Sequence, residues 1–145
     1  MSQRERQRQL RVVAELLLVH LPPLLQTDQP LAHDLMAVVA TALLAVHEDA
    51  ERSATAWDKR AYHLRADELR REWSWALAAA NTATELALSS APLRMTAIAK
   101  LRLLVRPTLK RPARRQITDP TRFRGAARAL AARRAGQRKV LRSSL

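Results

Sequence analysis

The stretch from Asp58 to Leu88 limits the possible folds of this chain more than any other part of it. It contains neither Gly nor Pro, and only Thr82 and Thr84 in it are β-branched. Small and apolar residues recur along it in alternating steps of four and three, the 3.5-residue period of a seam on one helix face. The seam positions are Tyr62, Ala66, Leu69, Trp73, Ala76, Ala80, Ala83 and Ala87. The pattern predicts one unbroken helix over residues 58–88, about 46 Å long, as the central element of the fold.

Two features predict a second apolar surface outside the core of a single bundle. Trp73 belongs to the seam, whereas Trp75 lies about 200° further round the same helix. Residues 35–46 include only one polar side chain, that of Thr41, so a helix there would be apolar almost all round. One bundle has one core and cannot cover both directions. We therefore expect a homo-oligomer, with an oligomer or partner interface that includes Val39, Leu43 and Trp75.

Composition and the positions of helix-capping and helix-breaking residues predict three more helices. Aromatic residues make up 3% of the chain and Gly occurs only twice, which favours helices over strands. The first helix is expected over residues 2–21, ended by Pro22 and Pro23. The second is expected to start with Asp28 as its cap and Pro30 in its first turn, and to end in solvent at residues 48–52.

The fourth predicted helix follows a turn at residues 89–92, in which Ser89 or Ser90 would act as a cap. It should run to about Arg106, with its apolar residues Ile98, Leu101 and Val105 facing inward. The fold expected from these elements is all-α, an up-down four-helix bundle over residues 1–111 with a basic, partly helical C-terminal extension over residues 112–145.

The C-terminal extension carries most of the net charge of +13. From residue 112 onward there are ten basic residues against Asp119 alone. Asp119 and Pro120 could start a short helix that ends at Gly136, with a thin apolar stripe of Phe123, Ala127 and Leu130. In isolation the extension should be mostly disordered. Its unopposed charge favours a polyanion as partner, RNA or single-stranded DNA. The predicted nucleic-acid-binding residues are Arg102, Arg106, Lys110, Arg111, Arg114, Arg115, Arg122, Arg124, Arg128, Arg133, Arg134, Arg138, Lys139 and Arg142.

Little in the sequence points to catalysis. Cys is absent, and the first Gly is Gly125, so neither a thiolate metal site nor a Gly-rich phosphate loop is available. The four His residues lie far apart in the sequence, and His63 with Asp67 would form at most half of a metal site. We expect no enzyme activity, no cofactor and no metal.

The expected location is cytoplasmic. The apolar run of the first helix is interrupted by Glu15, and it lacks a small-residue cleavage site before the prolines, which disfavours a secretory signal. Residues 35–46 are too few to cross a bilayer, which needs about 20. No membrane partner is expected.

Two segments resemble a known family. These are LPPLLQTDQPLAHDL and LRADELRREWSWALAAANTATELALSS, and the likeness extends roughly from Arg11 to Lys110. It is to small four-helix-bundle proteins that include the ribosomal intervening-sequence proteins, and in particular to the accessory variability proteins of diversity-generating retroelements. The chain lacks that family's Leu-Gly step at the start of the second helix and its Gly-Trp near the end of the fourth, where Val105-Arg106-Pro107 stands. The resemblance therefore does not predict how closely the fourth helix packs on the others.

The resemblance implies a basic, ring-shaped and typically pentameric homo-oligomer that binds a reverse transcriptase and its template RNA and catalyses nothing. The leading hypothesis is thus a non-enzymatic nucleic-acid-binding accessory subunit of a reverse transcriptase. Two alternatives stay open: a helical small subunit of a CRISPR effector complex, and a structural assembly protein whose basic extension docks on an acidic protein.

Overall fold

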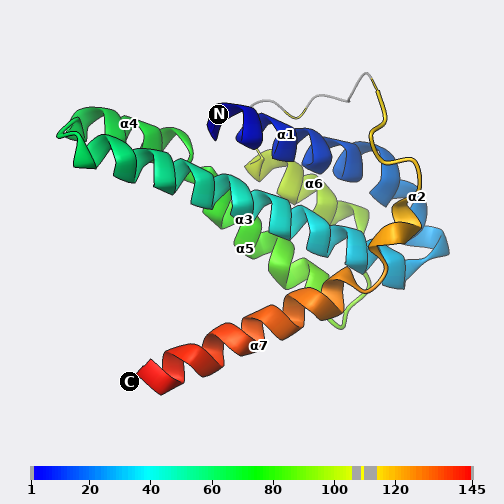
Figure 1. The fold of residues 1–145 in the computed structure, drawn as a ribbon. Coiled ribbons are helices and arrows are strands. Elements are labelled where there is room, and N and C mark those ends of the chain that lie inside the picture. Colours follow the sequence, from blue (N-terminus) through cyan, green and yellow to red (C-terminus); the bar gives the residue numbers. More distant parts are fainter. Residues whose placement is uncertain (1, 106–108, 110–113, 145) are drawn as a thin grey trace.

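One helix, α3 (Gln29–Lys59), forms the centre of the molecule. The structure is a computed structural model that describes residues 2–105, 109 and 114–144. Helices α1, α4, α5 and α7 all pack on α3, as Figure 1 shows. Residues 35–43 of α3 are buried except Val38 and Thr41. The central element is therefore this helix and not the expected helix over residues 58–88.

The N-terminal helical segment does not end at the prolines as expected. Helix α1 (Ser2–Glu15) passes into a π-helical turn, η1 (Leu16–His20), and then into α2 (Leu21–Thr27). In the π turn the backbone N–H of Leu21 donates to the carbonyl oxygen of Leu16. Pro22 and Pro23 then occupy the first turn of α2, where their missing N–H groups interrupt little of the helical hydrogen bonding.

Helix α3 begins where the sequence predicts but ends later. The Asp28 side chain accepts from the backbone N–H of Leu31 at 3.1 Å, which confirms the predicted cap. Residues 48–52 are not the solvent-exposed end, because the helix continues to Lys59 and Asp49 is buried. Arg6 of α1 donates to Asp49 at 2.8 Å. This ion pair compensates the buried charge of Asp49, so that the charged residues 48–52 can lie within the helix rather than at its end.

The expected helix over residues 58–88 is in fact two helices preceded by a turn. Ala61 adopts a left-handed conformation with φ 64°, the N–H of Tyr62 donates to the carbonyl of Trp57, and that of Ala61 to Asp58. These bonds form a Schellman ending for α3, with Ala in the position that Gly usually occupies. Packing of Trp57 on Tyr62, with ring centroids 5.6 Å apart, supplies the apolar contact that accompanies such an ending.

A second break follows at Trp73 and Ser74, which separates α4 (His63–Glu72) from α5 (Trp75–Leu88). The break turns the two indoles toward each other, with ring centroids 5.9 Å apart. Both pack against a small cluster of Leu10, Val46 and Ala76. The expectation that Trp73 and Trp75 face different surfaces was wrong, because it assumed a continuous helix.

Helix α6 (Met95–Leu104) follows a turn and packs on α5. Ile98, Leu101 and Val105 are buried, as the sequence predicts. Ser89 accepts from the N–H of Ala91 within the turn, but the residue that caps α6 is Arg94, whose side chain makes no capping bond. The expected helix end near Arg106 lies outside the described residues.

The C-terminal segment packs against the bundle through Ile117, Phe123 and Leu130. A short 3-10 turn, η2 (Pro120–Phe123), is capped by Asp119, and α7 (Ala126–Ser144) runs straight through Gly136. Ile117 is 2% exposed and Leu130 is 8% exposed, and both belong to the main core. The expected domain boundary at residue 111 lies outside the described residues, but the segments on its two sides contribute side chains to one common core.

The all-α class is confirmed, and the described residues include no strand. A regular four-helix bundle is not established, because α4 is a separate helix and α7 adds another to α3. By length and composition alone, residues 3–27 and 29–59 are each apolar enough to cross a membrane. In α3 this apolar surface is largely buried by the other helices.

Candidate nucleic-acid interface

We name residues 114–144 the arm. A buried carboxylate of the bundle holds the start of this arm in place. Glu15 is 1% exposed and lies at the junction of α1 and the π turn. Its carboxylate accepts from the backbone N–H groups of Gln116 at 2.6 Å and Ile117 at 2.8 Å, and from Nε2 of His20 at 2.8 Å. Burial would raise the pKa of Glu15, but these three donors together outweigh it and lower that pKa. Glu15 is thus a charged anchor for the start of the arm.

Two more carboxylates hold the next part of the arm. Asp34 on α3 accepts from the N–H groups of Gly125 at 3.1 Å and Ala127 at 3.0 Å, so it caps the N-terminus of α7 from another helix. Asp28 pairs with Arg124, and this guanidinium is the main cause that lowers the pKa of Asp28. Gly125 has φ 91°, a conformation that favours Gly and aims its N–H at Asp34.

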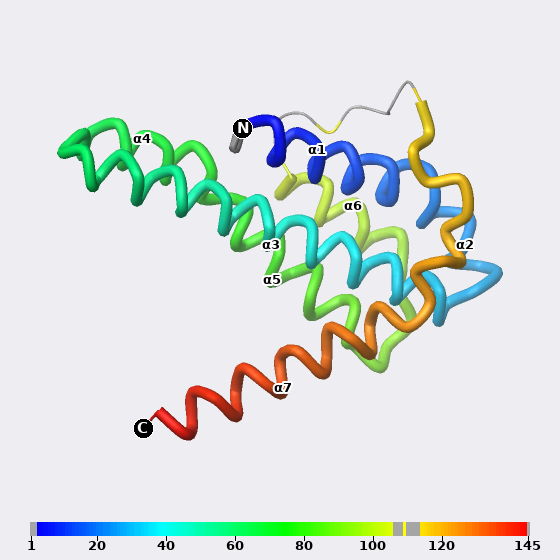
Figure 2. The backbone as a smooth tube through the Cα atoms, in the orientation of Figure 1, coloured from blue at the N-terminus to red at the C-terminus, as the bar shows by residue number. Residues whose placement is uncertain are grey.

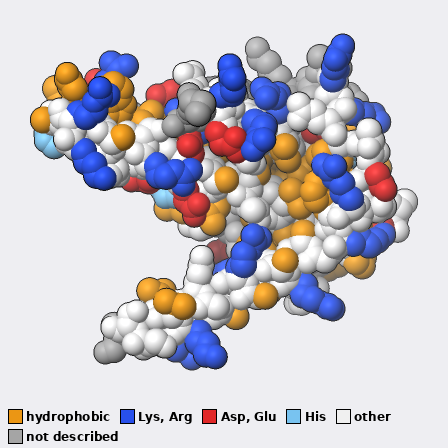
Figure 3. Space-filling view, in the orientation of Figure 1, with side chains coloured by type: hydrophobic (Ala, Val, Ile, Leu, Met, Phe, Trp, Pro, Cys, Tyr) orange, Lys and Arg blue, Asp and Glu red, His pale blue; other side chains and the backbone are white. Residues whose placement is uncertain are grey.

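The arm carries its cations on the outside. Nine of its ten basic side chains are exposed, and Arg134 is half-buried. In the described part of the chain, Arg124 alone among them forms an ion pair with a carboxylate. Arg133 donates to the Thr41 hydroxyl at 3.2 Å, and Arg122 stacks on Phe123. Figure 3 shows Lys and Arg side chains along both edges of the projecting helix.

Ten of the fourteen predicted nucleic-acid-binding residues belong to this arm. Arg106, Lys110 and Arg111 lie outside the described residues. Arg102 is exposed on α6, which packs on α5, and it is not part of the arm. The structure therefore groups the residues from Arg114 to Arg142 on one continuous segment, which includes η2 and α7 and whose cations have few partners among the described residues.

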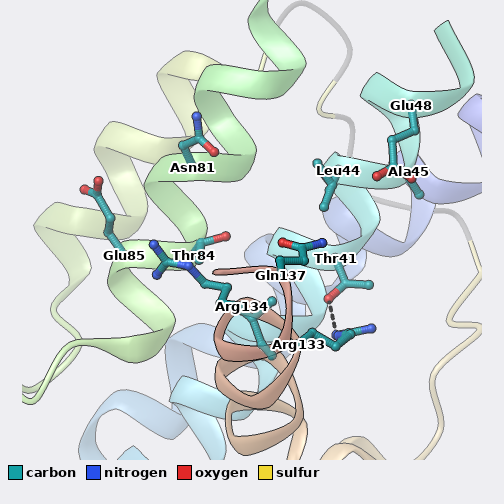
Figure 4. A pocket seen from close by; sticks show the side chains of 11 residues that line it. Thr41, Leu44, Ala45, Glu48, Asn81, Thr84, Glu85, Arg133, Arg134 and Gln137 are labelled. Atoms are coloured by element: carbon teal, nitrogen blue, oxygen red, sulfur yellow. Dashed lines mark hydrogen bonds between the residues drawn. The ribbon is translucent and has the colours of Figure 1, made fainter. Parts of the chain in front are cut away.

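A groove of about 530 Å³ lies beside the arm between α3, α5 and α7. Figure 4 shows its walls, with Arg133, Arg134 and Gln137 contributed by α7. Glu48 and Glu85 line the opposite side, and neither forms an ion pair in the described structure. Sequence reasoning missed this groove because it combines residues from three separate helices. Its two carboxylates, those of Glu48 and Glu85, make this side of the groove unfavourable for a phosphate.

The predicted interface residues are not a free surface. Val39 and Leu43 are fully buried in the main core, where α1, α5 and α7 cover α3. Trp75 is half-buried and packs against both apolar clusters of the chain. The prediction failed for Val39 and Leu43 because other helices of the same chain cover the side of α3 that carries them.

The histidines do not form a catalytic or metal-binding cluster in the described residues. His63 contacts Asp58 at 2.9 Å and not Asp67, because it follows the turn at Ala61. His33 lies between the carbonyl oxygens of Gln29 and Ala91. No group of three or more His, Asp or Glu side chains that could hold a metal ion occurs in this part of the chain.

Comparisons with protein-family models, with curated proteins and with solved structures found no match for this chain.

Proposed function

We propose that this protein is a non-enzymatic accessory subunit that binds nucleic acid through its arm. One observation carries the proposal. Within the described residues, only one of the arm's ten basic side chains forms an ion pair with a carboxylate, although three carboxylates of the bundle hold the arm in place. Such a density of like charge opposes folding unless a polyanion relieves it. Phosphates do so with a gain in entropy from released counterions.

The order of the arm supports binding rather than mere solubility. A charged extension that served only to solvate the protein would need no fixed position. Here Glu15 is buried at a desolvation cost, and this burial places Gln116 and Ile117. The fold therefore presents the cations as a pre-organised surface, which reduces the entropy lost on binding.

The partner protein and the assembly follow from the family resemblance described above. On that basis we propose a cytoplasmic subunit built on a four-helix bundle, which binds RNA or single-stranded DNA and assists the reverse transcriptase of a diversity-generating retroelement. A homo-oligomer, pentameric if the resemblance holds, is part of the same proposal. The covered faces of Val39 and Leu43 no longer support it, whereas exposed Met95 and Leu103 on α6 offer an apolar surface. Light scattering of the purified chain measures the assembly state.

The decisive experiment is RNA binding at several salt concentrations. If about six arm cations meet phosphates of a single strand, the slope of log K against log salt should be near −4. Replacing Arg128, Arg138, Lys139 and Arg142 together by Gln should flatten that slope by about 3. These four side chains are exposed and have no hydrogen-bond or ion-pair partner in the described structure, so the fold should survive.

A matched control removes four exposed cations from the bundle, namely Arg4, Arg11, Arg94 and Lys100. This control should leave the salt slope of RNA binding nearly unchanged, although it lowers the net charge by the same amount as the arm variant. Equal losses in the two variants would show unspecific attraction by net charge. No RNA affinity in the wild type, with binding of an acidic protein instead, would favour the structural-assembly alternative. Neighbouring genes distinguish a reverse transcriptase from the genes of a CRISPR effector.

A further inference from the structure

A second pocket, of about 470 Å³, lies between the start of α1, the end of α3 and α4. Figure 2 shows α4 running back along the end of α3, so that segments far apart in the sequence meet near the start of α1. Trp57 and Trp73 line this pocket, and both are half-buried. We name it the tryptophan pocket.

Two carboxylates in the tryptophan pocket have no basic partner among the described residues. Glu68 and Glu72 stand four residues apart on α4, which places them on one helix face, and both are exposed. Asp67 on the same helix, by contrast, pairs with Arg70 at 3.7 Å. Like charges at this spacing destabilise a helix. A ligand that donates hydrogen bonds to Glu68 and Glu72 would therefore relieve an unfavourable interaction.

Two guanidinium groups lie over the rings of the pocket. Cζ of Arg65 is 4.6 Å from the ring centroid of Trp57, and Cζ of Arg6 is 5.0 Å from that of Trp73. Arg6 is buried and pairs with Asp49. Arg65 is exposed and pairs with no carboxylate in the described structure, so its N–H groups are available to a ligand.

This mixture of donors and acceptors specifies the class of ligand. A basic side chain of a partner protein carries donors only, and Arg65 would repel it. A free phosphate carries acceptors, and the two carboxylates would repel it. A nucleobase has a flat face that stacks on an aromatic ring, and its edges carry both donors and acceptors. The tryptophan pocket therefore fits an unpaired base.

We infer that the tryptophan pocket binds an unpaired guanine of a single-stranded nucleic acid. The inference rests on the proposed function and adds a base preference to it. The guanine would take the place of Arg65 over the ring of Trp57, since stacking of a base contributes more than an exposed cation–π contact. Its 2-amino group would donate to Glu68 or Glu72, and its O6 and N7 would accept from the displaced Arg65.

The pocket supplies a kind of contact that the arm lacks. The arm has one aromatic residue, Phe123, and Arg122 already lies over its ring at 4.7 Å. Contacts to phosphate position a strand but carry no sequence information, whereas contacts to base edges do. The arm would thus provide affinity that depends on salt, and the tryptophan pocket would provide the preference for a base.

The test measures binding of the full-length protein to three labelled RNA strands of equal length, each long enough to extend beyond the arm. One strand contains only uracil, one has guanine at its centre, and one has hypoxanthine there. The guanine strand should bind about tenfold more tightly than the uracil strand. Hypoxanthine lacks only the 2-amino group of guanine, so it should lose most of this preference. The preference should persist as salt rises, because all three strands carry the same phosphates.

A double variant separates the base contact from the effect of net charge. Glu68→Ala with Glu72→Ala makes the protein more positive, so it should not weaken binding of the uracil strand. Its guanine preference should nevertheless fall below about threefold. Both side chains are exposed and Ala favours helices, so α4 should survive. The matched control, Glu48→Ala with Glu85→Ala, removes two exposed carboxylates that line the groove beside the arm, and should keep the full preference.

The outcomes distinguish this inference from the proposed function. Equal affinities for the three strands, or an unchanged guanine preference in the Glu68→Ala, Glu72→Ala variant, would overturn the inference while nucleic-acid binding by the arm stands. Equal loss of the preference in the control would also overturn it, because the preference would then depend on overall charge. Failure to bind any of the three strands would overturn both.

Discussion

Two parts of this molecule project from the core, and they use their charges in opposite ways. The first is the tip formed by the end of α3 and by α4, which we call the hairpin tip (residues 48–72). The second is the arm. The hairpin tip has nearly equal numbers of acidic and basic residues, seven and six, whereas the arm has ten basic residues and one acid.

In the hairpin tip the charges pair within the chain. Arg70 bonds to Asp58 at 2.8 Å and to Glu51 at 3.4 Å, and Asp58 also receives His63. These contacts with His63 and Arg70 lower the pKa of Asp58. Arg60 and Arg65 stack on the ring of Trp57. The cations of this tip therefore serve the fold, and in particular the turn at the end of α3.

In the arm, by contrast, most basic side chains are not paired with the carboxylates that lie nearby in the described structure. The bundle's carboxylates bind mainly backbone N–H groups of the arm, at Gln116, Ile117, Gly125 and Ala127. This arrangement fixes the arm without neutralising its side chains. The comparison indicates that the charge of the hairpin tip stabilises structure, and that the charge of the arm remains available for a partner.

The largest effect on stability is expected at the base of the hairpin tip. Arg6 and Asp49 form an ion pair with side chains only 7% and 9% exposed. Asp49→Ala should lower the free energy of unfolding by about 3–5 kcal/mol, because it leaves a buried guanidinium without its carboxylate. Chemical denaturation measures this loss. The double variant Arg6→Met, Asp49→Leu should recover most of it. A loss below about 1 kcal/mol for Asp49→Ala would mean that Arg6 escapes to solvent.

The next effect concerns whether the arm belongs to the core. Leu130 of α7 is buried among residues of the main cluster. Leu130→Ala should cost about 2–3 kcal/mol of unfolding free energy, by lost burial and a cavity. Leu141, 66% exposed on the same helix, is the matched control, and Leu141→Ala should change stability by no more than about 0.5 kcal/mol. If both changes were neutral in denaturant melts, the arm would be an independent tail.

A smaller effect is expected at the carboxylate anchor. Glu15→Gln keeps the size of the side chain but removes the negative charge to which the N–H groups of Gln116 and Ile117 donate. It should lower the free energy of unfolding by about 1–3 kcal/mol. Because the pKa of folded Glu15 is lowered, its stabilisation is present above the ordinary Glu value of about 4.3. It is lost as the pH falls through the lower folded value.

Amide chemical shifts of Gln116 and Ile117, followed by NMR in an acid titration, measure that dependence. In the wild type they should stay constant above about pH 5 and move as the pH falls further. In Glu15→Gln this transition should be absent. A transition of the same size in both proteins would assign the acid sensitivity to another group, such as Asp28 with Arg124.

Local signals allowed part of this fold to be predicted. Asp28 followed by Pro30 marks the start of α3 because capping and a fixed φ act within one turn. The spacing of Ile98, Leu101 and Val105 identifies the buried side of α6 for the same reason. The position of the cations in the arm is likewise visible, since ten basic residues in one segment stand out from composition alone.

The rest depended on contacts that no local pattern reveals. The turn at Ala61 uses a residue that seldom adopts positive φ, and Trp57 packing on Tyr62 compensates for that strain. The carboxylates of Glu15 and Asp34 meet backbone groups 101 and 91 residues further along the chain. An isolated acidic residue in an apolar helix, such as Glu15, suggests that its carboxylate is buried. The groups that bind this carboxylate come from distant parts of the chain and cannot be read from the local sequence.

The smallest effect on stability should come from two single arginines, one from each projecting region. Arg70→Gln removes the hub of the pairs in the hairpin tip, and Arg138→Gln removes an exposed cation of the arm. Surface ion pairs contribute little, so Arg70→Gln should lower the melting temperature only slightly and leave nucleic-acid affinity unchanged. Arg138→Gln should leave the melting temperature unchanged and reduce the salt slope of binding by about 0.7–0.9. Melting curves and binding titrations on both variants measure this crossed pattern. If both variants lost affinity equally, paired and unpaired cations would contribute alike, and the distinction between the hairpin tip and the arm would fail.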